Sequence, residues 1–129
     1  MSSSSSSSLA AGIGFELSPE QRELRDLAHD FAGLVVTTGG TGFGPRDLTP
    51  EGTRAVIERE APGFVEAIRR ASDAGGRGFG MLSRATAGTI GAALVCNLPG
   101  SSSGAIEGLD VLLPVVPHAL DLLAGGRPH

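Results

Sequence analysis

The fold is decided by the stretch Leu34-Val35-Val36-Thr37-Thr38-Gly39-Gly40-Thr41-Gly42-Phe43-Gly44-Pro45-Arg46-Asp47-Leu48-Thr49-Pro50. Its first residues are apolar and mostly β-branched, which is typical of a buried strand. Glycine follows at once, and a threonine before a proline is typical of a helix start. We therefore expect a buried strand over residues 34–38, a tight loop over 39–48 and a helix capped by Thr49. Ligands of open α/β sheets bind at the carboxyl ends of strands, so residues 39–47 are the predicted functional loop.

The glycines of this loop indicate how it could meet a ligand. Glycine adopts positive φ without strain and lets the backbone approach a ligand closely. Successive backbone N–H groups in such a turn form a concavity that binds anions. A tight strand-to-helix turn needs glycine as well, so the sequence physics leaves both a phosphate site and a structural turn open.

Composition excludes several classes of function. The chain has 129 residues, which suggests one domain, and it carries five Phe, no Tyr, no Trp and a net charge of −4. Scarce aromatic residues and negative charge argue against a nucleic-acid partner. All ten basic residues are Arg, and the missing lysine excludes a Walker-type phosphate loop and a Schiff-base enzyme.

The single cysteine and the hydropathy pattern give expectations about the cellular compartment and about membrane association. Cys96 alone can form neither an intrachain disulfide nor a multi-cysteine metal site, and a reducing cytoplasm is the natural interpretation. No apolar run reaches the roughly 18 residues of a membrane span, so we expect no membrane partner. No positive residue precedes an apolar segment at the N-terminus, so no secretory signal is predicted.

Residues 1–33 divide into two segments. Residues 1–14 include seven consecutive serines and are predicted to be a disordered, low-complexity tail. Residues 15–33 are predicted to form an amphipathic helix, with Ser18 and Gln21 as a capping box and Pro19 at the first helical position. The sequence of residues 14–26 resembles the first helix of acyl-CoA dehydrogenases. That resemblance implies a structural helix only, and an ordinary surface helix is the alternative.

Further elements are expected along the rest of the chain. They are a helix from Pro50 with its polar last turn at 58–60, a helix over 64–72, strands over 79–82 and 92–96 joined by a turn-rich connection at 87–91, a helix capped within Ser101–Ser103, and a last helix around 118–123. Both predicted strands end in polar residues, as expected where a sheet edge faces a ligand.

Five motifs occur in order along residues 34–129. They are Thr37-Thr38-Gly39-Gly40-Thr41-Gly42, Arg46-Asp47-Leu48-Thr49-Pro50, Glu58-Arg59-Glu60-Ala61-Pro62-Gly63, Leu82-Ser83-Arg84 and Asn97-Leu98-Pro99-Gly100-Ser101. In order and spacing they resemble the molybdopterin-binding (MoaB/Mog) family. The closing residues 113–123 are also similar to that family's end.

The resemblance implies a three-layer α/β/α domain that assembles as a homotrimer in the cytoplasm. It implies adenylylation of molybdopterin, the substrate, with ATP and Mg²⁺. Asp47 becomes the candidate catalytic and metal-binding residue, and the candidate cofactor-binding residues are Gly39, Gly40, Thr41, Gly42, Ser83, Asn97, Pro99, Gly100 and Ser101. For Asp47 a turn or capping role stays open, and for Ser83 and Asn97 a role in tying off strand ends stays open.

The sequence departs from the family pattern in two places. The family begins with a strand that carries a Ser-Asp pair, and here the serine tail and the residue 15–33 helix stand instead. The family loop after Asn-Leu-Pro-Gly-Ser commonly continues Pro-Lys, where this chain has Ser102-Ser103. We therefore expect a domain lacking its first strand or strands, with an uncovered sheet edge, weak binding or aggregation, and little adenylylation. An adenylyltransferase, a non-catalytic molybdopterin-binding module and an inactive truncated chimera all stay open.

Overall fold

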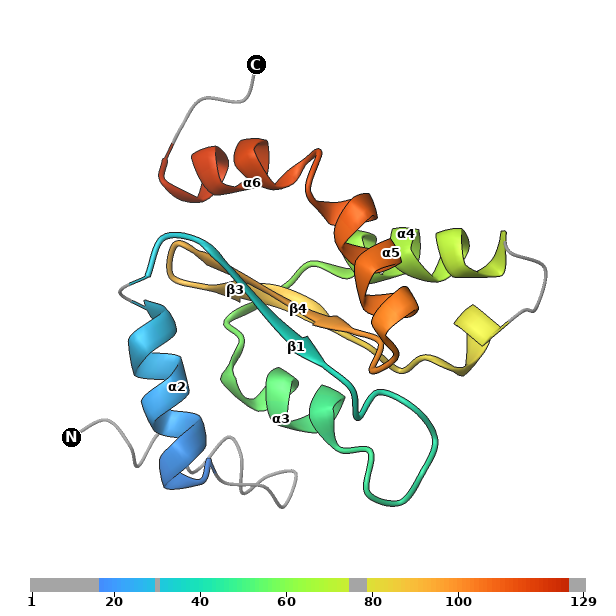
Figure 1. Ribbon diagram of the computed structural model, residues 1–129. Helices are drawn as coiled ribbons and strands as arrows, with labels where there is room; N and C mark the ends of the chain where they lie inside the picture. The colour runs from blue at the N-terminus through green and yellow to red at the C-terminus, as the bar shows by residue number, and fades with distance from the viewer. Residues whose placement is uncertain (1–16, 30, 75–78, 126–129) are drawn as a thin grey trace.

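The computed structural model describes residues 17–29, 31–74 and 79–125, and the predicted serine tail lies outside these ranges. Helices cover both faces of one sheet, with α4, α5 and α6 on one side and α2 and α3 on the other (Figure 1). This confirms the three-layer α/β/α architecture. The elements are α2 (Pro19–His29), β1 (Leu34–Thr38), α3 (Thr49–Val56), β2 (Arg59–Glu60), α4 (Pro62–Asp73), the 3₁₀ helix η1 (Phe79–Leu82), β3 (Ala87–Ile90), β4 (Ala93–Leu98), α5 (Ser102–Leu112) and α6 (Val116–Leu123).

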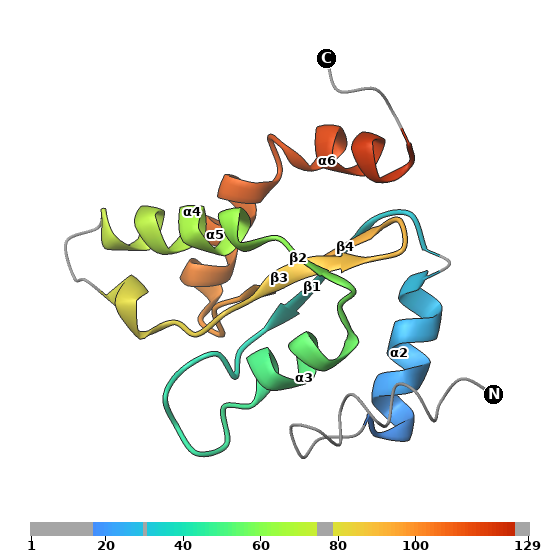
Figure 2. The ribbon, with the colours of Figure 1, turned by 180° about the vertical axis from the view of Figure 1, so that it is seen from behind.

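The sheet topology brings two loops together. The strand order is β1-β4-β3-β2, with β1 parallel to β4 and the other two pairs antiparallel. Figure 2 shows β2 beyond β3, on the side of the sheet away from β1. Thr38, the last residue of β1, pairs with Leu98, the last residue of β4. Because parallel strands run the same way, the loops that follow β1 and β4 leave the sheet at the same edge.

Strand β4 forms the centre of the core, since all six of its residues are buried. Its side chains alternate between the two faces, as the pleat requires. Leu94, Cys96 and Leu98 pack in the cluster that includes α4 and α5 residues, whereas Ala93 and Val95 pack with Val56 of α3. Cys96 is free and fully buried, and burial raises the pKa of its thiol to about 12.

Strand β1 has the predicted bounds but not the predicted burial. Its five residues are half-buried or exposed, and Val36 is 38% exposed. Among the described residues β1 pairs with β4 on one side only, which makes it an edge strand. The β-branched run therefore predicts the strand correctly, but its burial is wrong because apolar composition does not reveal a strand's place in a sheet.

The interpretation of residues 87–91 as a turn-rich connection is wrong. Residues 87–90 form β3, and Gly91, with a φ of +57°, makes the tight turn into β4. Gly88 occurs in a strand because a Cβ there would lie 2.5 Å from the backbone oxygen of Arg59 in β2. This close approach of two strands also explains why residues 58–60 are not a helical turn, since Arg59 and Glu60 form β2.

The strand predicted over residues 79–82 is also wrong, because this segment is the 3₁₀ helix η1. The N–H of Ser83 donates to the carbonyl of Gly80 at 3.1 Å, which closes the turn. The N–H of Gly80 donates to Asp73 Oδ1 at 2.8 Å, so α4 holds the beginning of the turn. The bond to Asp73 and the bond from Arg69 of α4 to the Ser83 carbonyl outweigh the local preference of a short apolar run.

Two of the three predicted helix caps are confirmed. Ser18 and Gln21 form the capping box, with N–H to side-chain bonds of 2.7 and 3.1 Å, and Ser101 caps α5. Thr49 is not the cap of α3, since Leu48 takes that position without a side-chain bond and the Thr49 N–H donates to Gly40. No helix in the described ranges is long and apolar enough to cross a membrane.

Candidate functional site

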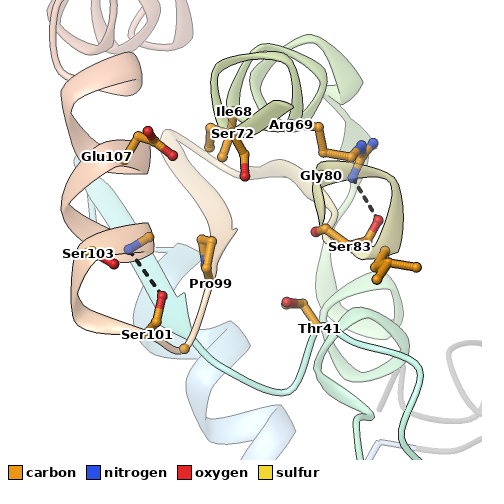
Figure 3. A pocket seen from close by; sticks show the side chains of 13 residues that line it. Thr41, Ile68, Arg69, Ser72, Gly80, Ser83, Pro99, Ser101, Ser103 and Glu107 are labelled. Carbon is orange, nitrogen blue, oxygen red and sulfur yellow. Dashed lines mark hydrogen bonds between the residues drawn. The ribbon is translucent and has the colours of Figure 1, made fainter. Parts of the chain in front are cut away.

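A cleft of about 430 Å³ lies at the sheet edge where β1 and β4 end (Figure 3). Ser101, Ser103 and Glu107 of α5 and its cap line one side, and Thr41 and Ser83 line the other. The full lining is Thr41, Ile68, Arg69, Ser72, Gly80, Leu82, Ser83, Pro99, Gly100, Ser101, Ser103, Gly104 and Glu107. Five of the sequence-predicted binding residues are among these: Thr41, Ser83, Pro99, Gly100 and Ser101.

The predicted binding residues Gly39, Gly40 and Gly42 do not line the cleft, and the first two form a turn in the loop that leads to Thr41. Gly39 and Gly40 have φ values of +89° and +70°, which other residues adopt only with strain. The Gly39 N–H donates to the carbonyl of Leu98 at 3.0 Å, which continues the β1–β4 pairing into the turn. A Cβ at Gly100 would lie 3.0 Å from the Cα of Gly39, so the two loops pack backbone against backbone. The close approach favours glycine at Gly100, and the positive φ favours glycine at Gly39.

The N-terminus of α5 opens onto the cleft. The Oγ of Ser101 accepts a hydrogen bond from the Gly104 N–H at 3.1 Å, and the carbonyl of Ser101 accepts from Ala105 at 2.9 Å. The N–H groups of Ser102 and Ser103 precede the first bonded turn and have no partner within the helix. Free N–H groups and the positive end of the helix dipole together favour an anion such as phosphate.

Asp47 lies in the outer part of the functional loop and does not line the cleft. Its Oδ2 accepts a hydrogen bond from the Gly44 N–H at 2.9 Å. A Cβ at Gly42 or Gly44 would lie 2.9 Å from the same Oδ2, so a larger residue at either position would displace the carboxylate. This contact agrees with the turn role left open for Asp47. No group of three His, Cys, Asp or Glu side chains suited to a metal ion occurs among the described residues.

Asn97 is fully buried and does not line the cleft. Its Oδ1 accepts from the Thr86 N–H at 3.0 Å, and its Nδ2 donates to the hydroxyls of Thr37 and Thr53 at 2.8 and 2.9 Å. We call these four residues the Asn97 cluster. Both amide protons are used within the protein, so the geometry assigns Asn97 the strand-tying role rather than a place in the cleft.

Arg84 is a site-shaping residue that sequence reasoning did not select. Its Nε donates to the Gly42 carbonyl at 2.7 Å, its Nη2 donates to the Asp47 carbonyl, and its Nη1 pairs with Glu51 Oε2 at 2.6 Å. We call Arg84 and these three partners the Arg84 cluster. The hydrogen bond from Arg84 lowers the pKa of Glu51, and Glu51 in turn raises the pKa of Arg84.

Sequence reasoning also missed the charged residues on the helical sides of the cleft. The Nη1 of Arg69 in α4 donates to the carbonyls of Ser83 and Ala85 at 3.4 and 3.2 Å, and Glu107 in α5 lines the opposite side. Arg84 stands in a quoted motif, but no sequence signal indicates that Glu51 is its partner. Helical periodicity predicts which residues share a face, but not which face borders a cleft.

Comparisons with known proteins identify the family. Residues 18–118 match the family described as probable molybdopterin binding domain, so the match includes α2. The chain is 42% identical over 92 residues to a molybdopterin adenylyltransferase of Helicobacter pylori, covering 71% of this chain and 52% of that protein. It is 37% identical over 109 residues to the molybdenum cofactor synthesis protein cinnamon of Drosophila melanogaster, covering 80% of this chain and 17% of that protein.

Solved structures agree with these matches. The Mog protein of Mycobacterium ulcerans superposes with a TM-score of 0.75 at 46% identity, over 83% of this chain and 69% of that one. A molybdopterin biosynthesis protein of Mycobacterium abscessus gives a TM-score of 0.69 at 35% identity, over 93% of this chain and 80% of that one. The chain spans about half, or less, of the curated relatives named above. Sequence and fold together show that the chain belongs to the molybdopterin-binding (MoaB/Mog) family.

Proposed function

We propose that the cleft binds molybdopterin and that the chain acts in the biosynthesis of the molybdenum cofactor. One observation carries the proposal: the Gly39–Gly40 turn and the α5 N-terminus meet at the ends of two parallel strands. The N–H groups of Ser102 and Ser103 at the α5 N-terminus supply an electropositive surface suited to a phosphate monoester, and the Gly39–Gly40 turn packs against Gly100 in the loop that leads to it. The molybdopterin adenylyltransferase of H. pylori supports molybdopterin as the ligand by its relatedness.

The residues present fit such a ligand. The hydroxyls of Thr41, Ser83 and Ser101 line the cleft and can hydrogen-bond phosphate oxygens. The guanidinium of Arg69 adds a positive charge on the α4 side. Pro99 and Ile68 supply apolar surface on which a ring system can lie. In this proposal the phosphate is bound at the α5 N-terminus, and the pterin occupies the space between α4 and α5.

We further propose that the bound molybdopterin is adenylylated with ATP and Mg²⁺. Mg²⁺ at this site would neutralise phosphate charge, and it typically uses only one or two protein carboxylates besides phosphate oxygens. Asp47 would supply that carboxylate, since it lies in the loop that borders the cleft. Nucleotidyl transfer depends mainly on positioning and charge neutralisation, so no covalent catalytic residue is needed.

A second candidate function is a binding module that holds molybdopterin without catalysis. The position of Asp47 favours it, because one carboxylate oxygen already accepts the Gly44 N–H and the residue does not line the cleft. The two candidates differ in a measurable way. Both predict molybdopterin binding, and only the first predicts release of pyrophosphate from ATP.

Titration of the full chain with molybdopterin, with and without ATP and Mg²⁺, tests both candidates. We expect saturable binding without ATP, and pyrophosphate release only in the complete mixture. Asp47→Asn should stop pyrophosphate release and change molybdopterin affinity by less than about threefold, since the amide keeps an oxygen for the Gly44 N–H. Gly100→Val should abolish binding because its side chain would push against Gly39. Absence of molybdopterin binding by the unchanged chain would overturn the proposal.

We also propose that the chain acts as a homotrimer in the cytoplasm. Exposed apolar side chains on α5 and α6 support self-association, among them Ile106 at 60% and Leu122 at 41% exposed. Burying such side chains between copies would remove apolar surface from water. Light scattering coupled to size exclusion should give three times the mass of 13.0 kDa. A monomer that still binds molybdopterin would contradict the trimer while leaving the binding proposal intact.

A further inference from the structure

Beyond its glycine turn, the functional loop is attached to the rest of the site through the hydrogen bonds of one residue, Arg84, among the residues that the structure describes. Residues 43–46 are exposed, and the bonds between Gly44 and Asp47 shape this part of the loop without fastening it to another element. Arg84 supplies the fastening at three places. Its own N–H donates to the Thr41 carbonyl at 2.7 Å, and its guanidinium reaches the carbonyls of Gly42 and Asp47.

We propose that Arg84 is a positioning residue that joins the functional loop and Ser83 into a single rigid wall facing the α5 N-terminus. Thr41 and Ser83 lie on this wall in Figure 3, opposite Ser101 and Ser103. We call the hydrogen bonds from Arg84 to the loop carbonyls the clamp. The clamp fixes the width of the cleft and the path of the loop as far as Asp47. The inference rests on the proposed function of the cleft, and it assigns to Arg84 the preorganisation of that cleft for a phosphate-bearing ligand.

The geometry requires arginine rather than any cation. Three acceptors surround the guanidinium from different directions, and its planar fork of five N–H donors can serve all of them at once. A lysine ammonium is a compact point charge that can pair with Glu51 but cannot also span the carbonyls of Gly42 and Asp47. The conservative change Arg84→Lys should therefore keep the ion pair and lose most of the positioning.

Glu51 holds the guanidinium of Arg84 in place against helix α3. It lies in the first turn of α3, where a carboxylate is favoured by the helix dipole. Its two oxygens accept from Nη1 at 2.6 Å and from Nη2 at 3.4 Å, so the guanidinium plane is oriented by a fork-to-fork contact. Glu51 thus orients Arg84, and Arg84 orients the loop.

The test compares Arg84→Ala and Arg84→Lys with the control Arg54→Ala. Arg54 is an exposed arginine in the last turn of α3, the helix that carries Glu51. Its removal changes the net charge by the same amount as the removal of Arg84. We expect Arg84→Ala to weaken molybdopterin binding about tenfold or more, because small misplacements of a binding loop have large effects. We expect the dissociation constant of Arg84→Lys, on a logarithmic scale, to lie closer to that of Arg84→Ala than to that of the unchanged chain. Arg54→Ala should bind molybdopterin as tightly as the unchanged chain.

Two readouts distinguish positioning from general stability. Amide hydrogen exchange of residues 41–47 should quicken in Arg84→Ala while exchange in β4 stays unchanged. Guanidinium ion, added well below its denaturing range, should bind the vacated position and restore affinity, and sodium chloride at equal ionic strength should not. Unchanged exchange and unchanged affinity in Arg84→Ala would overturn the inference, and so would loss of affinity with no rescue and no change in loop exchange.

Failure of the proposed function is recognised separately. If the unchanged chain binds no molybdopterin, the proposed function fails, and the hydrogen-exchange comparison still decides whether Arg84 clamps the loop. If Arg84→Ala does not fold, Glu51→Gln replaces it, because an amide leaves the fold intact and weakens the orientation of Arg84. Faster loop exchange in Glu51→Gln supports the clamp, and exchange identical to the unchanged chain contradicts it.

Discussion

The Asn97 cluster and the Arg84 cluster hold the same loop in different ways. Asn97 is fully buried and ties the end of β4 to β1, to α3 and to Thr86, the residue before β3, through neutral hydrogen bonds. Arg84 lies at the surface and ties the loop to α3 through a charged hydrogen bond and an ion pair. One cluster fixes where the loop begins, and the other fixes where the loop goes next.

The difference follows from access to water. A buried polar group that loses its partner keeps the full cost of desolvation, so the Asn97 cluster should control the free energy of unfolding. Water replaces the partner of an exposed charged group, so the Arg84 cluster should contribute little to global stability. It should instead control local order in the loop, where a few bonds decide between one conformation and many.

The largest expected effect is on the buried cluster. Asn97→Ala should lower the free energy of unfolding by about 2–4 kcal/mol, because the Thr86 N–H and the hydroxyls of Thr37 and Thr53 lose their partner. Urea unfolding followed by circular dichroism measures this change. Thr53→Val, which removes one of the three bonds, is the matched smaller change. If Asn97→Ala cost less than Thr53→Val, the cluster would not act as a unit.

The second largest expected effect is a loss of stability when the Gly39–Gly40 turn is changed. Gly40→Ala should destabilise the protein by about 2 kcal/mol, because φ is +70° and the new Cβ would meet Thr49 Oγ1 at 2.2 Å. Gly63→Ala is the matched control, since it lies in α4 and a Cβ there meets nothing within 4 Å. This control should stabilise by up to about 1 kcal/mol, since alanine favours the helix. Equal losses in both variants would contradict a strained turn.

The smallest expected effect is a pH dependence of the exposed cluster. The bond from Arg84 lowers the pKa of Glu51 from its ordinary value of 4.5. A lowered pKa in the folded state means that the stabilisation is present above pH 4.5 and is lost as the pH falls through the lower, folded value. The urea midpoints of the unchanged chain and Glu51→Gln should therefore differ slightly at pH 7 and converge in acid. A constant difference down to pH 3 would exclude Glu51 as the titrating group.

Local chemistry explains which parts of the fold could be predicted. The capping box at Ser18 and Gln21, the Ser101 cap and the bounds of β1 depend on neighbours within a few residues, and the structure confirms them. Strand β3 depends on Gly88 meeting Arg59 across the sheet, and η1 depends on Asp73. These contacts lie outside the segments themselves, so the local pattern of each segment alone predicted the wrong element.

The candidate site likewise has residues that the sequence motifs selected and residues that only the tertiary fold reveals. Ordered motifs predicted the family, and comparison confirms it. The motifs also selected Thr41, Ser83, Pro99, Gly100 and Ser101, which line the cleft, although their binding roles stay predictions. The same motifs selected Asn97, whose amide points into the core, because strand alternation places it on the face opposite Leu98. The pairing of Arg84 with Glu51 depends on the tertiary fold, and no local pattern encodes it.

The buried thiol of Cys96 makes the chain suitable for site-specific labelling. It is the only cysteine, and burial raises its pKa to about 12, so almost no thiolate exists near neutral pH. A cysteine introduced at the exposed Ser102 would therefore react with maleimide dyes long before Cys96 does. A fluorophore attached there would report on occupation of the α5 N-terminus in the otherwise native sequence, with no need to replace Cys96 first.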